Sequence, residues 1–415
     1  MDSFLNSKPH VILIAYYFPP LNVIGALRPF RFHKYLRQMG YTVDVVTATA
    51  QTGIPQPDIH CVPDETAVLW EKNTPVLHPS LMYQIERVVR KFALPGHVGL
   101  SWSWKAAEAV HRLAKSKQGR KVVLLTTYPP ISVLIAGLLA IRKTRLPWIA
   151  DFRDPMTFSN FAPKPALLRP VMSRVEGMTF RLASAVIANT SSAEDLWRST
   201  YPDQFHKLSV IWNGYDPEDQ PQALPIPLRD HKLLVHAGSL YDGRNANVLI
   251  EVLRRLRGYP DTPGVRLKLV GEIGSGSGVD KETYQEAAKQ GLLELVPQRV
   301  PRAEAHRMAA EADGLVLIQQ SKLTVPAKLY DYISIGRPIL ALAYPHTAVS
   351  ELLEKSGIPY VLISPEADAE TMDRQTIEYL SLPSNPTQPS EWFRNQFDVT
   401  RHAQQLASMI DQVSV

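Results

Sequence analysis

The chain has little of what several common protein classes require. It holds a single cysteine, Cys61, in 415 residues, which excludes an internal disulfide framework and is typical of a reducing compartment. It contains no Asp-x-Asp pair and no HExxH motif, and one cysteine cannot build a cysteine-rich zinc site. The sequence therefore predicts no dedicated metal centre.

Long hydrophobic runs and a strong charge bias are also missing. The longest apolar run, Ile131 to Ile141, is about half of a membrane-spanning helix, and the first residues carry no signal-peptide pattern. With 45 basic and 40 acidic residues the net charge is +5. This diffuse excess suits anionic substrates or an anionic membrane face, and no nucleic-acid motif accompanies it. We expect a cytoplasmic protein, with or without peripheral contact at the inner face of the cell membrane.

What the sequence does contain is a regular alternation of apolar strands with helical patterns. Val11–Tyr16 is a continuous apolar strand, Ala26–Met39 has helical spacing, and Thr42–Thr47 is the next strand. The same rhythm continues through the second half, from Leu233–Ala237 to Tyr360–Ile363. Strands that alternate with helices form parallel sheets covered on both faces. We therefore predict an α/β protein with two tandem, doubly wound, Rossmann-like domains.

A proline-rich stretch separates the two halves. Residues 217–227, PEDQPQALPIP, contain four prolines in eleven residues, a composition typical of a linker. We predict an N-terminal domain over 1–216, a second domain over 228–395, and a C-terminal helix over 396–415 that packs back on the first domain. Ligands of doubly wound domains bind at the carboxyl ends of the strands.

The segment 324–342, TVPAKLYDYISIGRPILAL, reads as a strand-to-helix junction that receives an anion. Pro326 suits the first helical position and Gly336 suits the left-handed residue past the helix end. The N-cap is then Val325, which has no side-chain acceptor, so the first amides of this helix lack a local partner. A helix start with available amides binds anions.

Lys328 lies in the first turn of that predicted helix, where a cation is unfavourable against the helix dipole. A negatively charged ligand reverses this penalty. Asp331 lies three residues further on the same face, where a carboxylate can accept two ribose hydroxyls. The alternative is an ordinary buried helix with a surface Lys–Asp pair.

Four segments together resemble a known family. They are AYYFPPLNVIGALRPFRFHKYLRQMGYTVDVVT (15–47), WIADFRDP (148–155), IWNGYDP (211–217) with HAGSLYDGRN (236–245), and the segment 324–342. The chain resembles retaining glycosyltransferases of the GT-B fold, in family 4, and within it the VPAK-type subgroup that acts on cell-surface polysaccharides and glycolipids.

The resemblance implies that the second domain holds a nucleotide-diphosphate sugar. Gly238 and Ser239 let the backbone approach a phosphate, and Arg244 matches the residue that grips the diphosphate with Lys328. Leu323 stands where the better-known family signature has a first Glu, a departure common in the VPAK-type subgroup. Asp331 stands where the family usually has Glu, and Val296–Val300 lies where the family holds the base. The implied donor-binding residues are Gly25, Gly238, Ser239, Arg244, Val296, Val300, Val325, Pro326, Ala327, Lys328 and Asp331.

The first domain holds the acceptor side in this family. Gly25 is the close-approach residue of the loop after the first strand, with Asn22 and Arg28 beside it. At a later strand end, Asp151, Arg153 and Asp154 point to acceptor positioning or proton uptake. The alternative is a local Arg–Asp network that holds the loop. The implied catalytic set is Asp151, Arg153, Asp154, Arg244 and Lys328.

The function that this resemblance implies is sugar transfer from a nucleotide-diphosphate sugar to a hydroxyl of a polysaccharide or lipid-linked saccharide. Transfer would be retaining and metal-independent, with no cofactor besides the co-substrate. Two alternatives remain: an epimerase or hydrolase on the same scaffold, and a non-catalytic nucleotide-sugar-binding subunit. The stretch 87–104 mixes basic and aromatic residues, which suits lipid headgroups or a loop packed on its own domain.

Overall fold

The computed structural model divides the chain into two compact units. Unit 1 comprises Met1–Trp212 and Thr400–Val415, and unit 2 comprises Asn213–Val399. The residues that the structure describes are 8–21, 23–50, 56–64, 99–157, 169–241, 243–257, 259, 262–274 and 276–414. Asn22 and most of the stretch 87–104 lie outside them. The sequence-based boundaries at 216, 227 and 395 stay predictions.

Within its described residues, unit 1 contains a seven-stranded sheet in the order β3-β2-β1-β4-β5-β6-β7, with every neighbouring pair parallel. Every residue of β1, β4 and β5 is buried, because these apolar segments are covered by helices on both faces. The strands are β1 (His10–Ile14), β2 (Thr42–Thr47), β3 (Ile59–Cys61), β4 (Val122–Tyr128), β5 (Trp148–Phe152), β6 (Ala185–Ala188) and β7 (Leu208–Val210).

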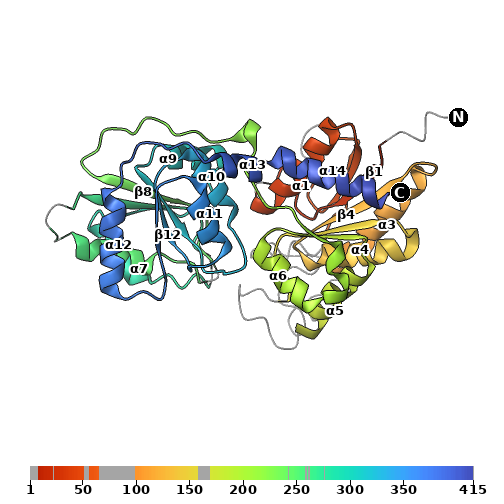
Figure 1. Cartoon of the computed structure of the whole chain (residues 1–415), viewed down its shortest axis with the longest axis horizontal. Coiled ribbons are helices and arrows are strands. Elements are labelled where there is room, and N and C mark those ends of the chain that lie inside the picture. The colour runs from red at the N-terminus through yellow and green to blue at the C-terminus, as the bar shows by residue number, and fades with distance from the viewer. Residues whose placement is uncertain are drawn as a thin grey trace, which may run out of the picture. The chain divides into compact units, whose positions relative to one another are not determined.

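Two helical layers cover this sheet. Alternate residues of β1 enter two different cores: Ile12 packs with the α3 and α4 side, whereas Leu13 packs with the α1 side and with Leu406 and Ile410 of α14. Figure 1 shows α14, in blue, beside α1 in red. The helices are α1 (Ile24–Gln38), α3 (Leu100–Ser116), α4 (Ile131–Thr144), α5 (Arg169–Leu182), α6 (Ser191–Thr200), the 3-10 helix η3 (Pro202–Lys207) and α14 (Val399–Val413).

Unit 2 contains, among its described residues, a six-stranded parallel sheet in the order β10-β9-β8-β11-β12-β13. The chain runs from β8 outward to β10, then returns to start β11 beside β8. The strands are β8 (Lys232–Ala237), β9 (Val265–Val270), β10 (Leu293–Val296), β11 (Gly314–Ile318), β12 (Ile339–Leu342) and β13 (Tyr360–Ile363).

The helices of unit 2 also form two layers. Side chains of α7, α8 and α12 make one core with the sheet, and α9 and α10 lie on its other side (Figure 1). The elements are η4 (Pro217–Asp219), α7 (Asn247–Leu256), α8 (Lys281–Lys289), α9 (Arg302–Ala310), α10 (Ala327–Ile335), α11 (Ala348–Ser356), α12 (Ala369–Ser381) and α13 (Glu391–Gln396). The prediction of two α/β parallel-sheet domains is confirmed.

In the part of the chain that the structure describes, no helix has the length and apolar character needed to cross a membrane.

Candidate functional site

The strand order of unit 2 creates a reversal point between β8 and β11. After β8 the chain moves toward β9, and after β11 it moves toward β12, so the two loops diverge and leave room at the carboxyl ends of these strands. Such reversal points are where doubly wound sheets bind ligands. Gly238 and Ser239 follow β8 directly, and Gly271 follows β9. A short loop connects the end of β11 to the start of α10.

Gly238 allows an unusually close approach of Lys328 at this point. The φ of Gly238 is 141°, which disfavours other residues, and a side-chain carbon built on Gly238 would overlap the Lys328 ammonium. The backbone of Gly238 and Ser239 also lies against Gly271, where a side-chain carbon would come within 2.6 Å of it. The two glycines therefore let two backbone segments and one lysine meet at the end of β8.

The charge of Lys328 is unfavourable in this place. Burial and, after it, the positive charge of Arg244 lower the pKa of Lys328 to about 7. Arg244 is itself buried and held beside Tyr241: its guanidinium lies 4.6 Å from the ring centroid, and Nη1 donates to the hydroxyl at 2.9 Å. The two cations thus lie close enough to repel each other, and an anion bound beside them would stabilise both charges.

Helix α10 starts one residue later than the sequence predicts. Pro326 has φ −69° and ψ 136° and is the N-cap, so Ala327 rather than Pro326 is the first helical residue. The prediction of Val325 as N-cap was therefore wrong, because the φ of proline suits both positions and only ψ separates them. No side chain caps this start, as expected. Gly336 ends the helix at φ 80°, as predicted.

Asp331 is buried and held by side chains of a neighbouring helix. Its Oδ1 accepts from Arg302 Nη2 at 2.9 Å, and its Oδ2 lies 3.2 Å from His306 Nε2. Both partners belong to α9. The carboxylate is thus already engaged, and its assignment to a ribose stays a prediction.

The remaining donor-side residues lie near the same edge of the sheet. Val296 is the last residue of β10, and its carbonyl accepts from the Gly271 N–H at 2.9 Å. Val300 follows in the loop before α9, and Val325 is buried just before α10. Gly271 was not selected from the sequence, although a glycine directly after an apolar strand is the pattern that points to such a position.

In unit 1 the structure buries Asp151 completely. Arg28 donates to its two oxygens at 2.7 and 2.9 Å, and Thr127 donates at 2.8 Å. Arg28 also donates to the carbonyls of Ile211 and Trp212 at 2.8 Å. Asp151 and Arg28 therefore tie the end of β5 to the start of α1, which supports the Arg–Asp network over proton uptake by this carboxylate.

Arg153 holds the loops at the same edge. Its guanidinium donates to the carbonyls of Gly25 at 2.6 Å, Pro129 at 2.7 Å and Tyr128 at 3.1 Å. Asp154 lies next to it, half-buried, with its charge close to Arg153. A catalytic role for these two residues stays a prediction, as does an acceptor-side role for Asn22, which lies outside the described residues.

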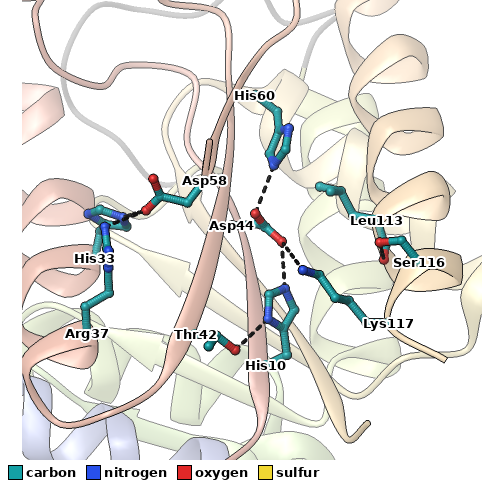
Figure 2. A network of polar contacts seen from close by, with 10 residues as sticks. All are labelled: His10, His33, Arg37, Thr42, Asp44, Asp58, His60, Leu113, Ser116 and Lys117. Carbon is teal, nitrogen blue, oxygen red and sulfur yellow. Dashed lines mark hydrogen bonds and ion pairs between the residues drawn. The ribbon is translucent and has the colours of Figure 1, made fainter. Parts of the chain in front are cut away.

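A separate polar network lies at the β1–β2–β3 side of unit 1 (Figure 2). Asp44 is 6% exposed, and its oxygens lie 2.9 Å from His10 Nε2, 2.9 Å from His60 Nε2 and 3.5 Å from Lys117 Nζ. His10 Nδ1 lies 2.7 Å from the Thr42 hydroxyl. Burial alone would raise the pKa of Asp44, but the two histidines and Lys117 outweigh it and hold the pKa well below its usual range.

Replacing Asp44 with asparagine is therefore expected to destabilise unit 1 by about 2 kcal/mol at neutral pH, since hydrogen bonds to a charged group contribute about 1.5–3 kcal/mol. A depressed carboxyl pKa stabilises the fold above the unfolded-state value of about 3.9, and that contribution is lost as pH falls toward the folded-state value. The deficit of Asp44→Asn should thus shrink below about pH 4. Urea unfolding at several pH values measures this, with exposed Asp195→Asn as the control. A deficit that stays constant into acid would contradict it.

Among the described residues, no group of three or more His, Cys, Asp or Glu side chains is arranged to hold a metal ion. The metal-independent character of the chemistry stays a prediction.

The two units, each a parallel sheet with helices on both faces, have the architecture of GT-B glycosyltransferases. Three solved structures share this fold over nearly their whole length. Sucrose-phosphate synthase of Thermosynechococcus elongatus has a TM-score of 0.68 at 15% identity, covering 98% of this chain and 99% of that one. HepE of Anabaena in complex with UDP-glucose has a TM-score of 0.59 at 15% identity, covering 97% of this chain and 99% of that one. The lipopolysaccharide outer core galactosyltransferase WaaB has a TM-score of 0.58 at 11% identity, covering 97% of this chain and 100% of that one.

Residues 30–219, just under half of the chain, match the family described as Glycosyltransferase Family 4. This part of the chain is thus similar to a glycosyltransferase family 4 domain, and the prediction that the protein is a glycosyltransferase is confirmed at this level. A search of curated proteins found no match.

Proposed function

We propose that this protein transfers a sugar from a nucleotide-diphosphate sugar to a hydroxyl of a polysaccharide or lipid-linked saccharide. The observation that carries the proposal is the convergence of Lys328, Arg244 and an uncapped helix start on glycine backbone at the reversal point of unit 2. Two cations and a helix start without a side-chain cap match the charge of a diphosphate.

The same groups suit the chemistry of transfer. When the bond to the sugar breaks, negative charge grows on the leaving diphosphate. Lys328, Arg244 and the first amides of α10 are fixed by packing before the reaction, so they stabilise this charge without reorganisation. Retention of configuration and independence of metal ions belong to the proposal through the family resemblance.

The donor and acceptor classes draw on similar proteins. HepE was solved with UDP and with UDP-glucose, and WaaB is a galactosyltransferase of the lipopolysaccharide outer core. We propose a donor of the same nucleotide-diphosphate type here, and an acceptor of the surface-glycan type. Action at the cytoplasmic face of the membrane is part of this proposal.

A thermal-shift panel of nucleotide sugars tests the donor. A ligand that binds only the folded state adds about 2.7 kcal/mol of stability at a hundred times its Kd, so one nucleotide sugar should raise the melting temperature clearly while free sugars do not. The protein is then incubated with the nucleotide sugar that stabilises it, once with a membrane extract as the source of acceptor and once without an extract. Transfer that needs the extract supports the proposal. Release or interconversion of the sugar without an acceptor favours the hydrolase or epimerase, and binding without turnover favours the non-catalytic subunit. No shift with any nucleotide sugar would contradict donor binding.

A further inference from the structure

His236 is a buried histidine in an otherwise apolar run of β8 and is not among the site residues predicted from the sequence. It is 1% exposed and precedes Ala237, the last residue of the strand. Its Nδ1 lies 2.9 Å from the carbonyl oxygen of Val316 in β11. A carbonyl only accepts, so Nδ1 carries the hydrogen and donates it. In a neutral imidazole the lone pair then lies on Nε2.

That lone pair faces Lys328. The distance from His236 Nε2 to Lys328 Nζ is 3.0 Å, so the lysine donates and the histidine accepts. Lysine has a long, flexible side chain whose direction is normally set by its partners. Here one partner is His236, and the absence of a side chain at Gly238 provides the space that the ammonium fills. His236 therefore fixes where the lysine charge stands.

The surroundings keep His236 neutral, as this role requires. Burial lowers the pKa of His236 well below its ordinary value, and the charges of Lys328 and Arg244 lower it further. The carbonyls of Val316 and Gly238 act in the opposite direction but are outweighed. A neutral imidazole is an acceptor across the physiological range, whereas a protonated one would repel the lysine.

The other ionisable groups near Lys328 are turned to partners of their own. On α10, the carboxylate of Asp331 accepts from Arg302 and His306 of α9, and the hydroxyl of Tyr332 accepts from the Ala237 N–H at 2.8 Å. Arg244, from the loop after β8, adds a second positive charge.

Lys328 thus faces a neutral acceptor and a cation. With a pKa of about 7, the Lys328 amine is neutral in roughly half of the protein molecules near pH 7. A diphosphate placed at the same point favours the charged form, so a proton is taken up where the amine was neutral.

We propose that His236 is the positioning residue that aims Lys328 at the diphosphate, and that the donor binds together with a proton taken up by Lys328. This inference rests on the proposed function, since it describes how the proposed diphosphate site works. It makes donor affinity pH-dependent: affinity is constant while Lys328 is already protonated, and falls as pH rises above its free-state value.

The test is calorimetric titration of the intact protein with UDP-glucose and GDP-mannose from about pH 6 to about pH 8.5. Each phosphorus of these probes carries one ester and one anhydride bond and has no oxygen that titrates near neutral pH, so the charge of the diphosphate is constant over this range. The affinity of the probe that binds should fall toward tenfold per pH unit above about pH 7. Titrations in two buffers of different ionisation enthalpy measure the number of protons taken up when the ligand binds. This number should approach one at the upper end of the pH range.

Three variants separate positioning from a general structural role. Lys328→Arg keeps its charge throughout, so its affinity should be independent of pH. His236→Phe removes the acceptor that stabilises the ammonium, so the fall should begin about one pH unit lower, giving about tenfold weaker binding near pH 8 but less than about twofold near pH 6. His236→Gln supplies a side-chain oxygen as acceptor and should restore most of the wild-type profile.

The outcomes distinguish this inference from the function on which it rests. If neither probe binds at any pH, the nucleotide sugar that the thermal-shift panel selects is titrated in the same way; if none of them binds, the proposed donor site fails, and the inference fails with it. If a probe binds but affinity is constant with pH and no proton is taken up, the inference is overturned and donor binding stands. If His236→Phe weakens binding equally at every pH, His236 has only a packing role. Should Lys328→Arg not bind, the pair of His236 variants still decides.

Discussion

Replacing Lys328 with alanine is expected to weaken nucleotide-sugar binding by about ten- to a hundredfold, the loss that corresponds to one hydrogen bond to a charged group. The side chain fills the space beside Gly238 and is held at 3.0 Å by His236, so no neighbouring group can take its place without moving. Arg244→Ala should have an effect of similar size, because the two cations converge on the same point. Binding is measured by thermal shift and by calorimetry with the nucleotide sugar that stabilises the wild-type protein.

Lys289→Ala is the matched control for Lys328→Ala. Lys289 is an exposed lysine in the last turn of α8, so its replacement makes the same Lys-to-Ala change without touching the candidate site. Far-ultraviolet circular dichroism checks that each variant is folded. Unchanged affinity in both Lys328→Ala and Arg244→Ala would refute the diphosphate site.

The second large effect concerns stability. Asp151→Ala is expected to destabilise unit 1 by about 3–5 kcal/mol, the usual result of removing one partner of a buried ion pair. Asp151 has no exposed surface, and its loss removes the carboxylate that balances the charge of the buried Arg28 guanidinium. Urea unfolding followed by the fluorescence of the buried tryptophans Trp102, Trp148 and Trp197 reports on this unit.

Asp195→Ala on α6 serves as the control, because substitution of an exposed residue usually changes stability by less than about 0.5 kcal/mol. The isosteric Asp151→Asn separates the two readings of this residue. A network role predicts lower stability together with altered activity. A variant that keeps full stability and loses only turnover would instead make Asp151 a catalytic residue.

The fold followed from the sequence because its main determinant is local. The run VILI in β1 is apolar throughout, which is typical of a strand buried on both faces. Three of the described helices were missed, namely α3, α12 and the short α13. In α3, Trp102, Ala106 and Val110 recur at intervals of four and are buried, but the helix begins after Gly99 without a capping side chain. In α12, by contrast, the start of the helix does carry a side-chain cap, because the Asp368 carboxylate accepts from the Thr371 N–H at 2.8 Å.

The candidate site was only partly predictable, because its residues come from distant segments. The glycine after β8 and the lysine in the VPAK segment could be selected from their local patterns. The partners of Asp331 could not: Arg302 and His306 lie on α9, more than twenty residues away, and reach it only through helix packing. His236 was equally hidden, since a single histidine in an apolar strand gives no indication of the side chain that it faces.

The order in which unit 1 is assembled follows from its last segment. Leu406 and Ile410 of α14 fill its core, and the Tyr41 hydroxyl donates to Asp411 at 2.8 Å. These residues are synthesised after the whole of unit 2, which is one continuous stretch of chain. During synthesis on the ribosome, therefore, the apolar surface of unit 1 that α14 covers stays uncovered until the last residues are made. Unit 2 is synthesised later than most of unit 1 but can complete its folding first.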